Sequence, residues 1–92
     1  MHTLPKISDL LEPLLRVLSE SGPMKAPSIE SSIVGVLNIP NDLRSTLRSG
    51  KRTELNYRLC WARTKAKNLG YVERQASGHW QITPLGKEFL GR

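Results

Sequence analysis

The chain has 92 residues, of which 38% are hydrophobic and 24% charged, and its net charge at neutral pH is +6. These proportions are typical of a globular protein, and the length accommodates a single hydrophobic core. We therefore expect one domain over residues 1–92. The longest apolar runs are only a few residues, against the ~20 that cross a bilayer, so no membrane-spanning segment is expected.

Residue types that carry catalysis or bind metals are sparse. Cys60 is the single cysteine, which excludes an internal disulfide, and His2 and His79 stand apart from it, so no metal-ligand spacing is present. No paired carboxylate orients either histidine, and there is no Gly-rich phosphate loop. We expect no cofactor and no enzyme activity from this chain by itself. No secretory leader follows Met1, so we expect a cytoplasmic protein.

Basic residues concentrate between Arg44 and Arg74. This stretch holds nine basic residues against two acidic ones, a net charge of +7, whereas the rest of the chain holds five basic and six acidic residues. A positive field on one part of a chain favours a nucleic-acid partner, because each Lys or Arg near a phosphate releases a condensed counterion. A solvated basic surface is the alternative that charge alone leaves open.

The first forty residues predict two helices separated by a break. The first begins near Asp9, with Ser8 as its N-cap, and stops at Gly22-Pro23. Its apolar stripe is Leu10, Leu11, Leu14, Leu15, Val17 and Leu18. Met24-Lys25-Ala26 is compatible with a short strand, and a second helix opens at 27–28. The inner face of that helix carries Ile29, Ile33, Val36 and Leu37.

A third, short helix is expected after Pro40. Asn41 is its predicted cap, Leu43 and Leu47 are its apolar residues, and Ser49-Gly50 ends it. A basic turn, Lys51-Arg52, then leads into the next helix.

The strongest helical signal runs from Thr53 to Asn68. Its apolar residues follow the spacing of one buried stripe: Leu55, Leu59, Ala62, Ala66 and Leu69. Gly70 is a fitting C-cap, because glycine adopts the left-handed conformation that ends many helices.

After Gly70 the pattern changes to strands. Tyr71 to Gln75 and His79 to Thr83 are rich in aromatic and β-branched residues and are joined through Ala76-Ser77-Gly78, which predicts a hairpin. In it, Val72 and Ile82 are core residues and Trp80 packs at the sheet edge. Thr83-Pro84 starts a last helix, closed by Leu85, Phe89 and Leu90. Helices followed by a two-stranded wing and a C-terminal helix predict a winged helix-turn-helix.

The sequence also resembles the N-terminal domain of Mrr-type restriction proteins. The resemblance rests on Gly50, Asn56-Tyr57-Arg58, Trp61-Ala62-Arg63-Thr64, Leu69-Gly70 and Gly78-His79-Trp80-Gln81-Ile82-Thr83-Pro84-Leu85-Gly86, with Leu11-Glu12-Pro13-Leu14-Leu15 in the first helix. It implies a winged helix placed ahead of a separate nuclease domain that cuts modified DNA.

The chain departs from that family at two points. At Ala66 and Leu69 the family more often has the large residue first, a swap that could preserve core volume. No Asp followed by Glu-x-Lys or Gln-x-Lys is present, so the nuclease part is absent from this sequence. We expect the chain to be the N-terminal part of a longer protein, with a homodimer forming through that parent.

The face of the long helix opposite its stripe carries side chains suited to reading bases. It holds Thr53, Asn56, Tyr57, Cys60, Thr64, Lys67 and Asn68, with Arg63 on one flank and Trp61 on the other. Asn pairs with adenine, Thr meets the thymine methyl, and Lys or Arg reaches guanine or phosphate. The candidate base-reading residues are Asn56, Tyr57, Thr64, Asn68 and Trp61; the candidate backbone contacts are Lys51, Arg52, Arg63 and Lys67. A merely solvated helix face is the alternative.

Three residues at the edge of this face have two interpretations. Arg58 is either a structural arginine, which we favour, or a DNA contact. Tyr57 and Trp61 either pack at the rim of the core, the commoner role, or offer an apolar surface to the methyl group of a modified base, as the resemblance implies. Removing roughly one methyl from water is worth about 0.8 kcal/mol, so one such contact discriminates weakly.

The wing offers Arg74, Gln75, Ser77 and His79 around a slim tip, which suits the minor groove or adjacent phosphates. An ordinary hairpin is the alternative.

The sequence therefore predicts a domain that binds double-stranded DNA, and the resemblance implies that it reads modified, for example methylated, DNA in a restriction system. A protein-interaction or dimerisation module that uses Trp61, Trp80 and Leu90, or a transcriptional regulator, is the alternative. The bases recognised and the modification are not specified by these patterns.

Overall fold

The computed structural model describes residues 3–91. They form α1 (Ile7–Ser21), α2 (Ala26–Leu37), α3 (Asn41–Arg44), β1 (Leu47–Ser49), β2 (Arg52–Thr53), α4 (Glu54–Asn68), β3 (Val72–Arg74), β4 (Trp80–Ile82) and α5 (Pro84–Leu90). The expected class, mainly helical with a small antiparallel hairpin, is confirmed. None of the helices in this part of the chain is long and apolar enough to cross a membrane.

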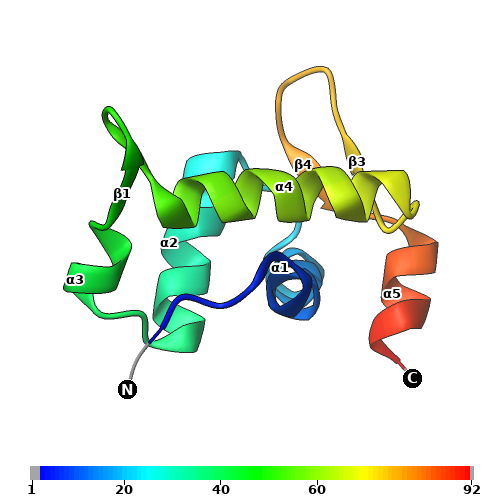
Figure 1. Cartoon of the computed structure of the whole chain (residues 1–92). Helices are drawn as coiled ribbons and strands as arrows, with labels where there is room; N and C mark the ends of the chain where they lie inside the picture. The colour runs from blue at the N-terminus through cyan, green and yellow to red at the C-terminus, as the bar shows by residue number, and fades with distance from the viewer. Residues whose placement is uncertain (1–2, 92) are drawn as a thin grey trace.

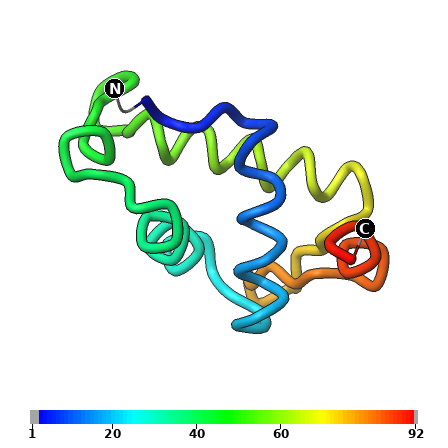
Figure 2. The backbone as a smooth tube through the Cα atoms, turned by 90° about the horizontal axis from the view of Figure 1, so that it is seen from below, coloured from blue at the N-terminus to red at the C-terminus, as the bar shows by residue number. Residues whose placement is uncertain are grey.

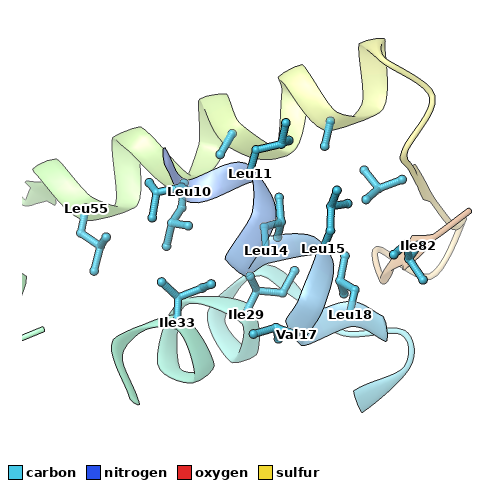
Figure 3. Packing of buried hydrophobic residues seen from close by; sticks show 14 of the residues in the cluster. Leu10, Leu11, Leu14, Leu15, Val17, Leu18, Ile29, Ile33, Leu55 and Ile82 are labelled. Atoms are coloured by element: carbon cyan, nitrogen blue, oxygen red, sulfur yellow. The ribbon is translucent and has the colours of Figure 1, made fainter. Parts of the chain in front are cut away.

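The core lies between α1 and α4, which cross each other steeply (Figures 1 and 2). The predicted stripe of α1 is entirely buried, and it packs against Leu55 and Leu59 of α4 and Ile29 and Ile33 of α2 (Figure 3). Ala62 and Ala66 are also fully buried. These small side chains let the backbone of α4 approach the large leucines of α1 closely, so one side of α4 is completely covered.

The hairpin that the sequence predicts as a wing is present as β3–β4, in which Val72 pairs with Ile82 and Arg74 with Trp80. Val72 and Ile82 are buried, as predicted. The suggested strand at Met24–Ala26 is reduced to one residue: Met24 exchanges two backbone hydrogen bonds with Trp80, of 3.0 and 2.7 Å. This bridge ties the start of α2 to the wing.

The predicted end of α4 and start of α5 are confirmed. Gly70, at φ 82°, donates its N–H to the Lys67 carbonyl, and Tyr71 donates to Ala66, which is the Schellman pattern. Thr83 caps α5 by accepting the Gly86 N–H at 3.2 Å, with Pro84 at the first helical position. Hydrogen bonds between neighbouring residues therefore fix the end of α4 and the start of α5.

The predicted third helix is wrong in its second half. α3 ends at Arg44, and the chain instead forms the β1–β2 hairpin, in which Leu47 pairs with Thr53. The Thr46 hydroxyl donates to the Asp42 carbonyl, and Gly50, at φ 55°, begins the tight turn that reverses the chain. Leu47 is 61% exposed and not a core residue.

Smaller differences concern caps and single apolar positions. α1 begins at Ile7, so Ser8 is not its N-cap, and Pro40 rather than Asn41 precedes α3. Val36 and Leu69 are exposed, against the predicted buried positions, and Leu69 already lies beyond the last residue of α4. Leu85 is exposed as well, while Phe89 and Leu90 pack against the core.

Gly86→Ala should destabilise the fold strongly. A Cβ at this buried position would overlap the backbone oxygen of Tyr71, so the backbone just before β3 would have to shift. We expect a loss of about 1–3 kcal/mol in the free energy of unfolding, measured by urea titration. Gly35→Ala is the matched control: it lies in α2 with nothing within 4 Å, so alanine should add about 0.5–1 kcal/mol. Equal effects of the two changes would contradict this packing.

Candidate nucleic-acid interface

Two hairpins project on the same side of α4, β1–β2 at its N-terminal end and β3–β4 over its C-terminal half (Figure 1). The β1–β2 hairpin precedes the first turn of α4, and the β3–β4 hairpin follows its last. The start of α2 lies behind α4 on this same side (Figure 1). We call this surface the hairpin face: the 47–53 hairpin, the uncovered side of α4 and the 74–80 hairpin turn.

Most predicted base-reading residues lie on the uncovered side of α4. Asn56 and Asn68 are exposed, and Tyr57 and Thr64 are half-buried. The Thr64 hydroxyl donates to the Cys60 carbonyl at 3.0 Å, so its methyl group is the part left for an outside contact. Trp61 is 50% exposed, so it is not a core residue, and its apolar surface faces solvent.

Aromatic rings and arginines gather at the N-terminal end of α4. The Arg48 guanidinium lies 3.5 Å from the centre of the Tyr57 ring, Arg52 lies 5.5 Å from it, and Tyr57 meets Trp61 edge to face at 6.5 Å. Arg52 also donates from Nε to the Asn56 Oδ1 at 3.0 Å. This arginine–aromatic cluster couples the β1–β2 hairpin to the helix. It presents cations beside a flat apolar surface.

Glu54, the first residue of α4, holds Arg48 of the cluster by a hydrogen bond. It accepts from Arg48 at 3.0 Å and from the Arg58 Nε at 3.4 Å. The hydrogen bond from Arg48 holds the pKa of the Glu54 carboxyl below its usual value, with the charges of Arg48 and Arg58 adding to it. Arg58 also donates to the backbone oxygens of Leu4 and Pro5, each at 3.0 Å. It therefore has the structural role that the sequence favours.

The predicted backbone contacts fall into two groups. Lys51, Arg52 and Lys67 are exposed. Arg63 is only 9% exposed, so its predicted place on the flank of an open face is wrong. Trp80 lies over it, with the guanidinium 5.6 Å from the ring centre, because the wing folds back onto this side of α4.

The predicted wing residues are held by local bonds. Ser77 Oγ lies 2.9 Å from His79 Nδ1, and Gln75 donates its side-chain amide to Gln81. Arg74 is exposed, with its guanidinium 6.0 Å from the Trp80 ring. These bonds shape the turn and leave Arg74 as its outward charge.

Two basic residues of this surface were not singled out from sequence. Arg48 was counted only in the basic stretch, and its place over Tyr57 depends on the unpredicted hairpin. Lys25 lies beside Arg63 and Arg74 only because Met24 pairs with Trp80. Within residues 3–91, no three His, Cys, Asp or Glu side chains gather as a metal site. The chemistry offered is therefore that of cations, amides and aromatic surface.

The family model of the Mrr N-terminal domain matches residues 8–92. No curated protein and no solved structure matches the chain significantly.

Glu54→Gln should loosen the join between the β1–β2 hairpin and α4 in a pH-dependent way. The folded state lowers the pKa of Glu54, so its stabilising effect is present above the unfolded value near 4.5 and is lost as pH falls through the folded value. Urea unfolding should therefore find the variant less stable than the wild type at pH 7, with the difference shrinking below about pH 4.

Glu12→Gln is the control for that measurement, because Glu12 pairs with Arg16 on the exposed side of α1. Its effect should stay within roughly 0.5 kcal/mol at neutral pH. A Glu54→Gln difference that does not change with pH would contradict the assigned ion pairs.

Proposed function

Because the chain belongs to the Mrr N-terminal domain family, we propose that it is a winged-helix domain that binds double-stranded DNA and recognises the target of an Mrr-type restriction endonuclease. The observation that carries the proposal is the hairpin face. The elements of this face carry exposed cations: Lys51 on the first hairpin, Lys67 on α4 and Arg74 on the second hairpin. Phosphate backbones require such a distribution of charge.

The order of elements supports the winged-helix assignment. α1, α2 and α4 form a three-helix core, and β3–β4 follows α4 directly. Met24 joins Trp80 as the single-residue third strand of that sheet. In this arrangement α4 is the recognition helix, and β3–β4 is the wing.

α4 is the element that enters the major groove in this proposal. Its 15 residues span about 22 Å, whereas the groove is ~12 Å wide. Both ends of the helix therefore reach the phosphates that border the groove. Asn56, Thr64 and Asn68 face base edges, while Lys51, Arg52 and Lys67 contact the backbone.

Trp61 supports the finer proposal that the domain reads a modified base. The half-exposed indole offers a partner a flat apolar surface on the hairpin face. The methyl group of N-methylated adenine or 5-methylated cytosine projects into the major groove, where Trp61 would meet it beside Tyr57.

The alternative of an interaction module through Trp61, Trp80 and Leu90 finds less support. Trp80 is half-buried beside the guanidinium groups of Arg63 and Arg74, and Leu90 packs against the core. Trp61 alone of the three is exposed, so they do not form one apolar surface.

Binding to a duplex should depend steeply on salt. With about four phosphates contacted, affinity should fall roughly a hundredfold between 50 and 200 mM salt, measured by fluorescence anisotropy. Lys67→Glu and Lys51→Glu should each weaken binding roughly 5- to 30-fold, a loss of about 1–2 kcal/mol. Lys87→Glu on α5, which extends away from the hairpins, is the control and should bind as the wild type does. If no binding to the duplex is measured at low salt, the proposal of DNA binding is refuted.

Methylation should strengthen binding, and Trp61→Ala should remove the gain. We compare identical duplexes that are unmodified, adenine-methylated and cytosine-methylated. One buried methyl group corresponds to roughly a fourfold preference, and one on each strand to about 15-fold, at about 0.8 kcal/mol each. Leu85→Ala, at an equally accessible apolar residue on α5, should keep the preference. Equal wild-type affinities for the three duplexes would rule out the reader while leaving DNA binding intact.

A further inference from the structure

An open hollow of about 430 Å³ lies between the wing, α4 and the start of α2. Three cations line it: Lys25 from the residue before α2, Arg63 from α4 and Arg74 from β3. Trp80 forms part of its wall. No carboxylate is among the lining residues, so its charge is uniformly positive.

Arg63 is the unusual member of this set. It is nine-tenths buried, and no hydrogen-bond acceptor within residues 3–91 reaches its Nε. Burial lowers the pKa of its guanidinium, although an arginine in a protein stays charged. The Trp80 ring at 5.6 Å offers a weak cation–π contact and no acceptor. A buried guanidinium Nε–H without an acceptor is costly, and a bound anion would relieve that cost.

The first turn of α2 adds uncompensated donors beside Arg63. No side chain caps this helix, and its first turn has no acidic residue. Pro27 has no N–H, so the free amides at this end are those of Ala26 and Ser28. Together with the helix dipole they favour a negative group. The start of α2 also lies on the same side of the molecule as the two hairpins (Figure 1).

We propose that this hollow holds one phosphate of the DNA backbone, next to the groove that α4 enters. The inference rests on the proposed function and assigns a site to it. Arg63 donates to the phosphate from within, Lys25 and Arg74 from the rim, and the first turn of α2 from its end. A phosphate bound here would fix the duplex against both the wing and α2, which neither the exposed lysines nor the β1–β2 hairpin can do.

The salt dependence of duplex binding tests whether the rim cations share one phosphate. Each phosphate contact contributes about 0.9 to the slope of log affinity against log salt. Lys25→Gln and Arg74→Gln should each reduce the slope by up to that amount. The double variant should reduce it by about 0.9 and not by twice as much, because one phosphate is lost only once. Lys87→Gln is the matched control and should leave the slope unchanged.

The Nε–H of Arg63 gives a second readout that leaves the buried side chain intact. In ¹⁵N-labelled protein its signal should shift when duplex is added, and the shift should disappear in the Lys25→Gln/Arg74→Gln variant. Inorganic phosphate alone, added at millimolar concentration, shows whether the site binds a free phosphate ion or requires a phosphate of the DNA backbone. A signal that moves with inorganic phosphate and not with duplex would overturn the assignment to the DNA backbone.

The remaining outcomes are distinct from one another. A loss of about 0.9 in each single variant, summing to about 1.8 in the double variant, would place Lys25 and Arg74 on separate phosphates and overturn the shared site. A slope that the double variant leaves unchanged would overturn it as well. In both cases wild-type binding to DNA would still stand. Failure of the wild type to bind any duplex at low salt would instead overturn the proposed function itself.

Discussion

The burial of one side of α4 against α1 is the constraint on which the rest of the molecule depends. Leu55, Leu59, Ala62 and Ala66 are fully covered, and the two alanines permit the close approach. This packing fixes α4 lengthwise across the domain, and the uncovered side carries polar and aromatic groups (Figure 2). The two hairpins and the start of α2 lie around this helix.

The charges of the hairpin face are organised rather than scattered. Glu54 draws Arg48 and Arg58 to the first turn of α4, which leaves Arg58 facing inward to the N-terminal segment and Arg48 outward over Tyr57. At the other end, Trp80 gathers Arg63 and Arg74. Each end of α4 thus pairs an aromatic ring with two arginines, and Trp61 lies exposed between them. A polyanion with flat bases matches this alternation of charge and aromatic surface.

Short-range signals made much of this fold predictable. The leucine and alanine spacing located α4 to within one residue, and Gly70 and Thr83-Pro84 marked real junctions. The β1–β2 hairpin was not predicted because all three residues of β1 are exposed. Its sequence therefore lacks the alternation of buried apolar and exposed polar residues that indicates a strand. The prediction placed Arg63 on an open flank because helix geometry puts it just outside the buried stripe of α4. Its burial comes from the β3–β4 hairpin and the start of α2, which the spacing within α4 does not reveal. Trp61 is half-exposed and meets Tyr57 edge to face, which fits a residue at the rim of the core and not one inside it.

The central claim is that a duplex lies on the hairpin face, along α4. Mapping the backbone amide shifts of ¹⁵N-labelled protein as duplex DNA is added tests it most directly. The account predicts that the perturbed signals come from the 47–53 hairpin, the uncovered side of α4, the 74–80 turn and the start of α2. Perturbations confined to α5 and the exposed side of α1 would contradict it.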